Sequence, residues 1–456
     1  MEQDMTRGNI TSIMLRFAIP LFIGNAFQTF YNMADSIIVG RFLGEEALAA
    51  VGSTGIIMFL LFSFSGGVVS GFTILTSQKY GAHDSDGVRR TVSNGCLLAL
   101  LIGAGATVLG LAAIVPLLRF MNTPENIFAD AQTYITIICA GTLASLFYNL
   151  LSSYLRAIGN SKIPVAFLVF SSLLNIFLDI VFIVKFQLGV AGAAIATITA
   201  QGIAALLCGI YIVLKVRVLV PHRSQWKLYR YESREQLRLG IPMAMQFAIT
   251  ASGAVVMQSA MNMFGSTAIA ATTAGMKIQE MLIQGIYAMG ATMATFVGQN
   301  FGSRNLDRIR AGVKRAVVII SIYGAIAAVC MYFLLPVFLK VFFAAGTDMT
   351  ELLYWAKRFF NIVSLFYIPL GFIFIFRNAM QGCGNSMIPL GCGIVEFFSR
   401  IITAELSIHT GSFVLACLCD PMAWLTAGMF AMLGFIYVFR KLSLPKGSSG
   451  TVTVNE

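Results

Sequence analysis

The amino-acid sequence predicts an all-α polytopic membrane protein with twelve transmembrane helices in two six-helix lobes. Hydrophobic residues make up 57% of the 456 residues and charged residues only 11%. This balance, with a mean hydropathy of +0.81, excludes an ordinary soluble domain. A spanning helix needs about 20 apolar residues, and the chain contains many uncharged runs of that length. A repeat between the two halves of the chain predicts the two lobes.

The expected spans follow these apolar runs and are separated by polar or basic connections. In chain order they are 13–39, 47–77, 91–118, 131–155, 163–185, 190–216, 235–263, 268–299, 314–340, 355–380, 387–408 and 412–439.

Lys and Arg in the connections predict the orientation of the chain. If the N-terminus is cytoplasmic, the inside connections hold most of the basic residues, with the largest groups at 215–238 and 304–315. We therefore expect both termini to be cytoplasmic and the chain to lie in the plasma membrane. This bias, with contact to anionic lipid heads, accounts for the net charge of +11, so no nucleic-acid partner is expected.

The domain division follows from the longest polar stretch and from the repeat. We expect an N-terminal lobe at 1–216, a cytoplasmic linker at 217–234, a C-terminal lobe at 235–440 and a polar cytoplasmic tail at 441–456. Six spans in each half give the two copies the same orientation, so the axis that relates them runs along the membrane normal. Three motifs recur in order and at nearly constant spacing: Leu15–Pro20 as Leu237–Pro242, Gln78–Gly81 as Gln299–Gly302, and Gly159–Ser161 as Gly384–Ser386.

A polar stripe marks the first span. Asn25, Gln28, Asn32 and Asp35 recur at intervals of three and four residues, so they share one helix face. An ionisable group inside a spanning helix is unfavourable by about 3 kcal/mol on insertion scales, so it usually faces a bundle interior or a cavity and serves function. The alternative, that the stripe only holds neighbouring helices by hydrogen bonds, stays open here.

These features resemble the multidrug and toxic compound extrusion family over about residues 10–440. The resemblance implies a twelve-helix antiporter whose two lobes face a central cleft and which exports organic compounds in exchange for sodium ions or protons. It also implies small organic substrates, a monomer in the lipid bilayer, no enzymatic activity, and no cofactor besides the coupling ion. The residues that carry it are Pro20, Ala34–Ser36 with Val39–Arg41, the Gln78/Gly81 and Gln299/Gly302 helix ends, Arg156–Pro164 and Gly189–Thr197.

In the branch similar to the DNA-damage-inducible F proteins, the resemblance implies an ion-coupling site at Asp35, Asn175, Asp179 and Thr197. The rise of 1.5 Å per helical residue places Asp35, Asp179 and Thr197 in the same outer half of the membrane. Carboxylate, amide and hydroxyl oxygens suit a sodium ion at Asp35 and Asp179, and two carboxylates can equally share a proton. The alternative, two acids satisfied separately by backbone or loop bases, stays open.

Four further residues of the N-terminal lobe match positions of the same branch. Gln28, Tyr31 and Asn149 match polar positions that line its substrate cavity, although residues that only bond neighbouring helices would look the same. Pro20 removes a backbone hydrogen bond, and the resemblance implies a hinge there. Its alternative is a harmless place in the first helical turn.

The charged residues of the C-terminal lobe are expected to have a structural role and not to bind a coupling ion. Glu396 and Arg400 are four residues apart on one helix face, so we predict a structural ion pair, with substrate contact as the alternative. Where the sodium-driven branch has a glutamate in the seventh span, this chain has neutral residues such as Gln246 and Thr250. A coupling site in this lobe is therefore not expected.

Other functions are less consistent with the sequence. The eight cysteines show no CxxC pair and the three histidines lie far apart, so no structural metal site is expected. A lipid-linked oligosaccharide flippase would need several basic residues around the cavity, yet only Lys277, Arg377 and Arg400 lie within spans of one half. An intramembrane enzyme would need a nucleophile, a base or a metal cluster, and an ion channel would normally be an oligomer. The substrate and the choice between Na⁺ and H⁺ stay open.

Overall fold

The computed structural model describes residues 3–342 and 349–443, and no β-strand is present in that part of the chain. Long apolar helices form nearly all of it. The helices are α1 (Ile10–Leu43), α2 (Glu45–Ser53), α3 (Gly55–Gly81), α4 (Ser85–Phe120), α5 (Glu125–Ala140), α6 (Thr142–Ala157), α7 (Lys162–Ile180), α8 (Gly189–Lys215), α9 (Arg230–Met261), α10 (Gly265–Gly302), α11 (Leu306–Phe342), α12 (Met349–Val363), α13 (Tyr367–Gly382), α14 (Met387–Thr410) and α15 (Phe413–Ser443).

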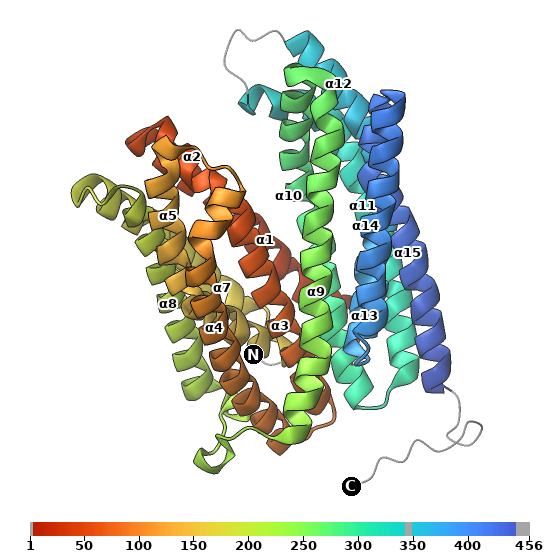
Figure 1. Ribbon diagram of the computed structural model, residues 1–456. Coiled ribbons are helices and arrows are strands. Elements are labelled where there is room, and N and C mark those ends of the chain that lie inside the picture. Colours follow the sequence, from red (N-terminus) through yellow and green to blue (C-terminus); the bar gives the residue numbers. More distant parts are fainter. Residues whose placement is uncertain (1–2, 343–348, 444–456) are drawn as a thin grey trace.

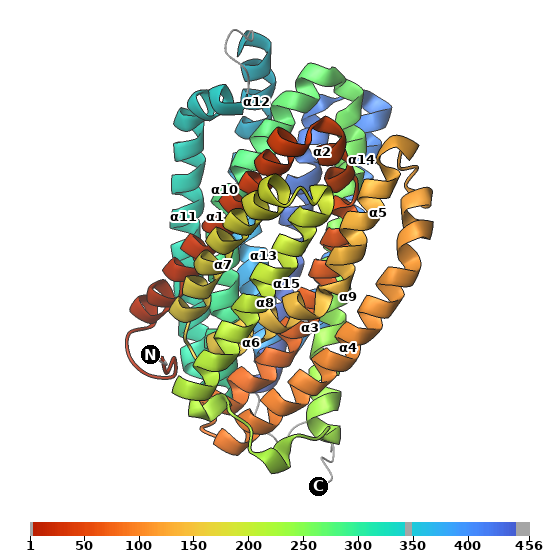
Figure 2. The ribbon, with the colours of Figure 1, turned by 90° about the vertical axis from the view of Figure 1, so that its left-hand side faces the viewer.

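Two bundles stand side by side in Figure 1, with α1–α8 in red to olive and α9–α15 in green to blue. Their helices converge toward the lower end of the view, where the connection between α8 and α9 lies, and diverge toward the upper end. In the quarter turn of Figure 2, the connection between α8 and α9 again lies at the lower end. The predicted arrangement in two helical lobes is confirmed.

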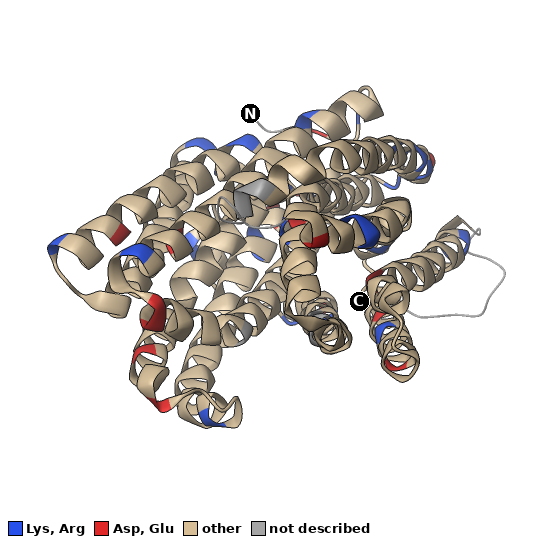
Figure 3. Ribbon diagram, turned by 90° about the horizontal axis from the view of Figure 1, so that it is seen from above, with Lys and Arg blue, Asp and Glu red and all other residues tan. Residues whose placement is uncertain are grey.

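Each predicted span has its helix or helix pair. Ten helical stretches of the described residues are long and apolar enough to cross a membrane, and α5 with α6, bent by 45°, forms an eleventh. One of the ten, Val256–Gly302, runs from the last turns of α9 through α10. The predicted span 235–263 corresponds to α9, and the predicted span 268–299 corresponds to α10. Seen from above in Figure 3, most of the ribbon is uncharged, as a lipid-facing helical bundle requires.

Several predicted spans and boundaries differ from the structure; the span 131–155, for example, is divided at Gly141 between α5 and α6. The span 47–77 is not one helix, because the chain breaks at Thr54 between α2 and α3. The linker 217–234 is too long at its end, because α9 already begins at Arg230. The early turns of α9 pack on α4 instead of facing water: Gln236 accepts a 2.8 Å hydrogen bond from Asn94 and is fully buried. Of the predicted tail 441–456, residues 444–456 lie outside the described residues.

The repeated motifs have the same backbone geometry in both halves. Gly159 and Gly384 have φ angles of 86° and 82°, which a residue with a Cβ atom rarely adopts. The next residue in each copy, Asn160 or Asn385, accepts a 3.2 Å hydrogen bond from the backbone N–H three residues later. Each copy thereby starts its helix, α7 or α14, in the same way, as the internal repeat predicts.

The second repeated motif lies where the two halves meet. A Cβ atom on Gly81 would lie 1.9 Å from the carbonyl oxygen of Gln299, and one on Gly302 would lie 1.8 Å from that of Gln78. The ends of α3 and α10 therefore approach each other reciprocally, as equivalent residues do beside a two-fold axis. Only a residue without a side chain fits at either position.

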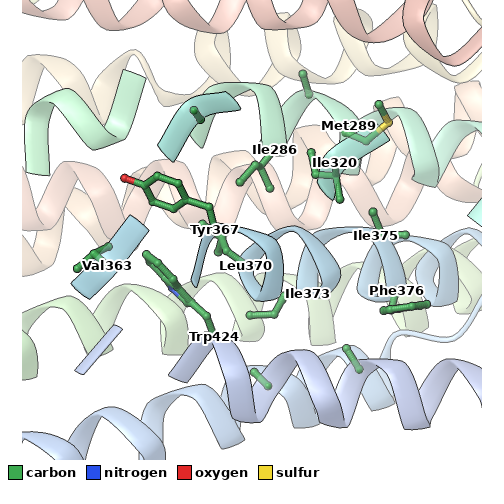
Figure 4. Close-up of a cluster of buried hydrophobic side chains, with 14 of the residues drawn as sticks. Ile286, Met289, Ile320, Val363, Tyr367, Leu370, Ile373, Ile375, Phe376 and Trp424 are labelled. Atoms are coloured by element: carbon green, nitrogen blue, oxygen red, sulfur yellow. The ribbon is translucent and has the colours of Figure 1, made fainter. Parts of the chain in front are cut away.

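Close packing holds each bundle together, because lipid tails are as apolar as the side chains and provide no hydrophobic drive between helices. In the N-terminal half, Ala196, Ala200 and Ala204 follow one face of α8 and are at most 2% exposed, which lets neighbouring helices approach closely. In the C-terminal half, larger side chains from α10, α11, α12, α13 and α15 fill the interior, among them Tyr367 and Trp424 (Figure 4).

Candidate functional site

The structure brings the four predicted ion-coupling residues together from three helices. Asp35 of α1 and Asp179 of α7 have their carboxyl groups within hydrogen-bonding distance of each other. The amide of Asn175, one turn before Asp179, donates to Asp179 Oδ2 at 2.9 Å. Its oxygen accepts from the backbone N–H of Thr197 in α8 at 3.1 Å. The Asp35 carboxylate thus comes from α1. The Asp179 carboxylate comes from α7, which the Asn175 hydrogen bond joins to α8.

This cluster is buried and has no basic partner. Asp179 is 0% exposed and Asn175 1%, and Asp35 is partly exposed. No Lys or Arg of the described residues forms an ion pair with either carboxylate, and Oδ1 of each Asp is buried without a hydrogen-bond partner there. Two carboxylates so close repel each other unless a cation or a proton lies between them. The free oxygens, the Asn175 amide and the Thr197 hydroxyl are the hard ligands that a small cation takes.

Two tyrosines border the carboxylates. The hydroxyl of Tyr31, one turn before Asp35 on α1, lies close to the Thr197 side chain. Tyr134 of α5 is 3% exposed and lies within electrostatic range of both carboxylates. The resemblance implies that Tyr31 lines the substrate cavity, and the structure places it beside the two carboxylates. Nothing in the sequence marked Tyr134, because one tyrosine in an apolar span is common.

A π-helical turn, Val181–Lys185, begins two residues after Asp179. Such turns are rare and often occur at functional sites, because they insert an extra residue into the helix. The turn contacts α1 as well as α8, so it lies against the helix that carries Asp35. No sequence pattern predicted it.

The other predicted residues of the N-terminal half lie elsewhere. Gln28 is exposed on α1, and Asn149 donates a 2.9 Å hydrogen bond to the Ser145 carbonyl within α6. Neither has a hydrogen bond to Asp35 or Asp179 among the described residues. Pro20 lies ten residues into the continuous helix α1, so its alternative place in the first turn is wrong.

The C-terminal half contains a second buried cluster of charges. Arg400 Nη2 lies 2.9 Å from Glu396 Oε1, so the predicted pair is in contact. Arg400 Nε also lies 2.7 Å from Asp420 Oδ1, and Arg377 Nη1 lies 4.0 Å from Glu396 Oε2. Sequence reasoning missed Asp420, although a lone carboxylate in the last apolar span was a usable signal. Two acids and two bases make this cluster neutral.

Hydrogen bonds join the two halves at the end of the molecule where α1 begins. Gln78 Nε2 donates a 2.8 Å hydrogen bond to the carbonyl of Gly382 across the two halves. The backbone N–H of Met5 donates to Gln299 Oε1 at 2.9 Å, and the Met5 side chain is fully buried. The segment before α1 is therefore part of this contact, which sequence reasoning did not anticipate.

The comparisons with known proteins agree with the fold and the repeat. The MatE family model matches residues 20–181 and 242–406, one segment in each half. The chain is 28% identical over 400 residues to the probable multidrug resistance protein YpnP of Bacillus subtilis, covering 87% of both chains. It is 30% identical over 204 residues to the DNA damage-inducible protein F of Escherichia coli, covering 44% of this chain and 43% of that protein.

Solved structures share the complete fold. A MOP superfamily transporter from Pyrococcus furiosus superposes with a TM-score of 0.90 at 22% identity, over 97% of this chain and 98% of that one. The family match covers most of the chain, including both halves of the repeat. This chain therefore belongs to the MatE family, the multidrug and toxic compound extrusion proteins, whose members are membrane transporters and not enzymes.

Proposed function

We propose that this protein is a secondary active antiporter of the plasma membrane that exports cationic or amphiphilic organic compounds in exchange for Na⁺ or H⁺. The observation that carries the proposal is the buried, uncompensated pair Asp35 and Asp179. The relative in Bacillus subtilis is named a probable multidrug resistance protein, which supports organic compounds as cargo. The protein acts as a monomer, and it needs no cofactor besides the coupling ion.

Coupling follows from the helices that supply the two carboxylates. Asp35 lies on α1, whereas Asn175, Asp179 and Thr197 lie on α7 and α8. A cation or proton between the carboxylates removes their repulsion and holds α1 against α7. Helix α1 also contacts α10 of the other half, where the side chains of Thr29 and Gln284 are 3.4 Å apart. Ion binding thus acts on a helix that touches both halves.

Alternating access requires that ion and drug favour different states, because a ligand that binds both states equally shifts nothing. Uptake of drug from the inside requires the contact between the ends of α3 and α10 to separate. Pro20 is the proposed hinge of α1, because it leaves a carbonyl of the preceding turn without its backbone donor.

The charges of the C-terminal half favour the antiporter over a lipid-linked oligosaccharide flippase. Such a flippase moves anionic lipids and would be expected to carry uncompensated bases at its cavity. Here Arg377 and Arg400 are neutralised by Glu396 and Asp420.

Transport in proteoliposomes tests the proposal, with sodium and pH gradients imposed separately and a fluorescent organic cation as cargo. One of the two gradients should drive export by the wild-type protein, and Asp35→Asn should abolish that export. Asp130→Asn is the matched control, because Asp130 is an exposed carboxylate of α5. Export of equal rate from Asp35→Asn and wild type would overturn the proposal.

A further inference from the structure

A groove with a volume of about 720 Å³ lies between the start of α1 and the first turns of α11. It is separate from the carboxylate cluster and is on the side of the molecule where the chain termini lie. Its lining combines basic, hydroxyl and aliphatic side chains: Asn9, Ile10, Thr11, Ser12, Leu15, Arg16, Ile19 and Arg315. We infer that this groove binds the phosphate headgroup of an anionic phospholipid of the inner leaflet.

The two arginines provide the charge for a phosphate. Arg16 of α1 and Arg315 of α11 are exposed, and neither forms an ion pair or hydrogen bond with another described residue. They come from different helices and line one groove, so their charges add instead of being neutralised by nearby carboxylates. A guanidinium presents two parallel N–H donors, which match two phosphate oxygens. No acidic residue lines the groove to compete with the phosphate.

The hydroxyl groups of Thr11 and Ser12 provide further donors beside the arginines. The Asn9 side chain is already engaged, because its oxygen accepts the Ser12 backbone N–H at 3.1 Å. The polar part of the groove is thus confined to the first turn of α1 and the two guanidinium groups. That extent suits one headgroup.

The aliphatic side chains decide between a lipid and a free phosphate. Leu15 and Ile19, one turn apart on α1, are 37% and 52% exposed beside Arg16. They continue the groove away from the helix start, toward the hydrocarbon region. A free phosphate would leave them unused, whereas a phospholipid places its acyl chains there and its phosphate at the arginines. Arginines near the membrane boundary reach polar headgroups in this way.

Native mass spectrometry in a neutral detergent tests this inference with phosphatidylglycerol and phosphatidylcholine of the same acyl chains. The double variant Arg16→Gln/Arg315→Gln should lose roughly tenfold in affinity for phosphatidylglycerol. Its affinity for phosphatidylcholine should not change. Arg234→Gln is the matched control, because Arg234 is an exposed base outside the groove. An equal loss in Arg234→Gln, or no loss in the double variant, would overturn the inference.

Two further measurements distinguish the source of the phosphate and do not depend on the variants. Inorganic phosphate at millimolar concentration should leave bound phosphatidylglycerol in place; displacement would mean a site for free phosphate. A photoactivatable phosphatidylglycerol in membranes that contain wild-type protein should label peptides from 9–19 and 306–320. Labelling confined to other helices would contradict the inference even if the double variant did not fold.

Discussion

Two buried clusters of charged side chains lie between the described helices of this protein, and they differ in net charge. Asp35 and Asp179 form a cluster of acids without a base, whereas the cluster around Arg400 balances two acids with two bases. A balanced cluster stabilises one packed arrangement, because each charge is compensated where it lies. An unbalanced cluster changes its energy whenever a cation or proton arrives, and that property suits it to coupling.

At the coupling cluster we expect graded effects that follow the number of charges lost. Asp179→Asn removes a carboxylate and should abolish gradient-driven export. Thr197→Ala removes one neutral ligand and should weaken coupling-ion affinity by roughly threefold to tenfold, the equivalent of one hydrogen bond. The measurement is export rate against sodium or proton concentration. A Thr197→Ala protein as inactive as Asp179→Asn would contradict this order.

At the balanced cluster we expect a loss of stability instead. Glu396→Gln leaves the buried Arg377 without its carboxylate and Arg400 with Asp420 alone, and breaking a buried pair costs about 3 to 5 kcal/mol. The folded yield and the thermal unfolding temperature in detergent should fall. Glu280→Gln is the control, because Glu280 forms only an exposed pair with Lys277. A stable Glu396→Gln protein with an altered substrate range would show that this cluster belongs to the substrate site.

At the scale of helices, the reciprocal contact of Gly81 and Gly302 holds the C-terminal ends of α3 and α10 together. Gly81→Ala or Gly302→Ala puts a methyl group within 2 Å of a backbone carbonyl, so it should favour the state in which these ends separate. Distances between spin labels on the C-terminal ends of α3 and α10 measure that shift.

Gly105→Ala is the control for this prediction, because a Cβ atom at Gly105 meets nothing within 4 Å. It should leave the distances unchanged and raise helix stability by roughly 0.5 to 1 kcal/mol. Identical distance distributions in wild type, Gly81→Ala and Gly302→Ala would show that this contact does not hold the closed state.

The start of α4 gives a pH-dependent prediction outside the membrane spans. Asp84 caps this helix, since its Oδ1 accepts the Gly87 N–H at 2.8 Å and its Oδ2 lies 3.1 Å from Lys79. Burial raises the pKa of this carboxyl, but the hydrogen bonds from Gly87 and Lys79 outweigh burial and hold the pKa below its ordinary value of 3.8. The stabilisation is therefore present at neutral pH and is lost as pH falls through the lowered pKa.

Asp84→Ala should then lower the free energy of unfolding by about 0.5 to 2 kcal/mol at pH 7. The difference from wild type should shrink when the pH falls below 3.8. Thermal unfolding at both pH values measures it, with the exposed Asp86→Ala as control. A difference in the free energy of unfolding that stays constant with pH would show that the ionised carboxylate of Asp84 does not stabilise the start of α4.

At the scale of the whole molecule, basic residues predict that both termini and the α8–α9 connection face the cytoplasm. Single cysteines at Ser224 and Asn122, on a cysteine-free background, should report opposite sides. An impermeant thiol reagent added to intact cells should label Asn122→Cys and not Ser224→Cys. Labelling of Ser224→Cys from outside would show that the topology, and with it the direction of the proposed transport, is the opposite of the one predicted.

Much of the molecule follows from the sequence alone. Hydropathy predicts the spans, because a bilayer admits only long apolar helices. The repeat predicts two lobes of the same orientation, and the structure gives both copies of the Gly-Asn-Ser turn one geometry. The order of motifs indicates the family, and helix depth alone places Asp35 and Asp179 in the same half of the membrane.

Only the tertiary structure decides which side chains meet. Hydropathy fixes how deep a residue lies in the membrane, but not how far its helix is rotated, because most faces of a spanning helix are apolar. The contact of Arg400 with Asp420 and that of Tyr31 with Thr197 depend on such rotations. They are set by close packing between helices, which no local sequence pattern records.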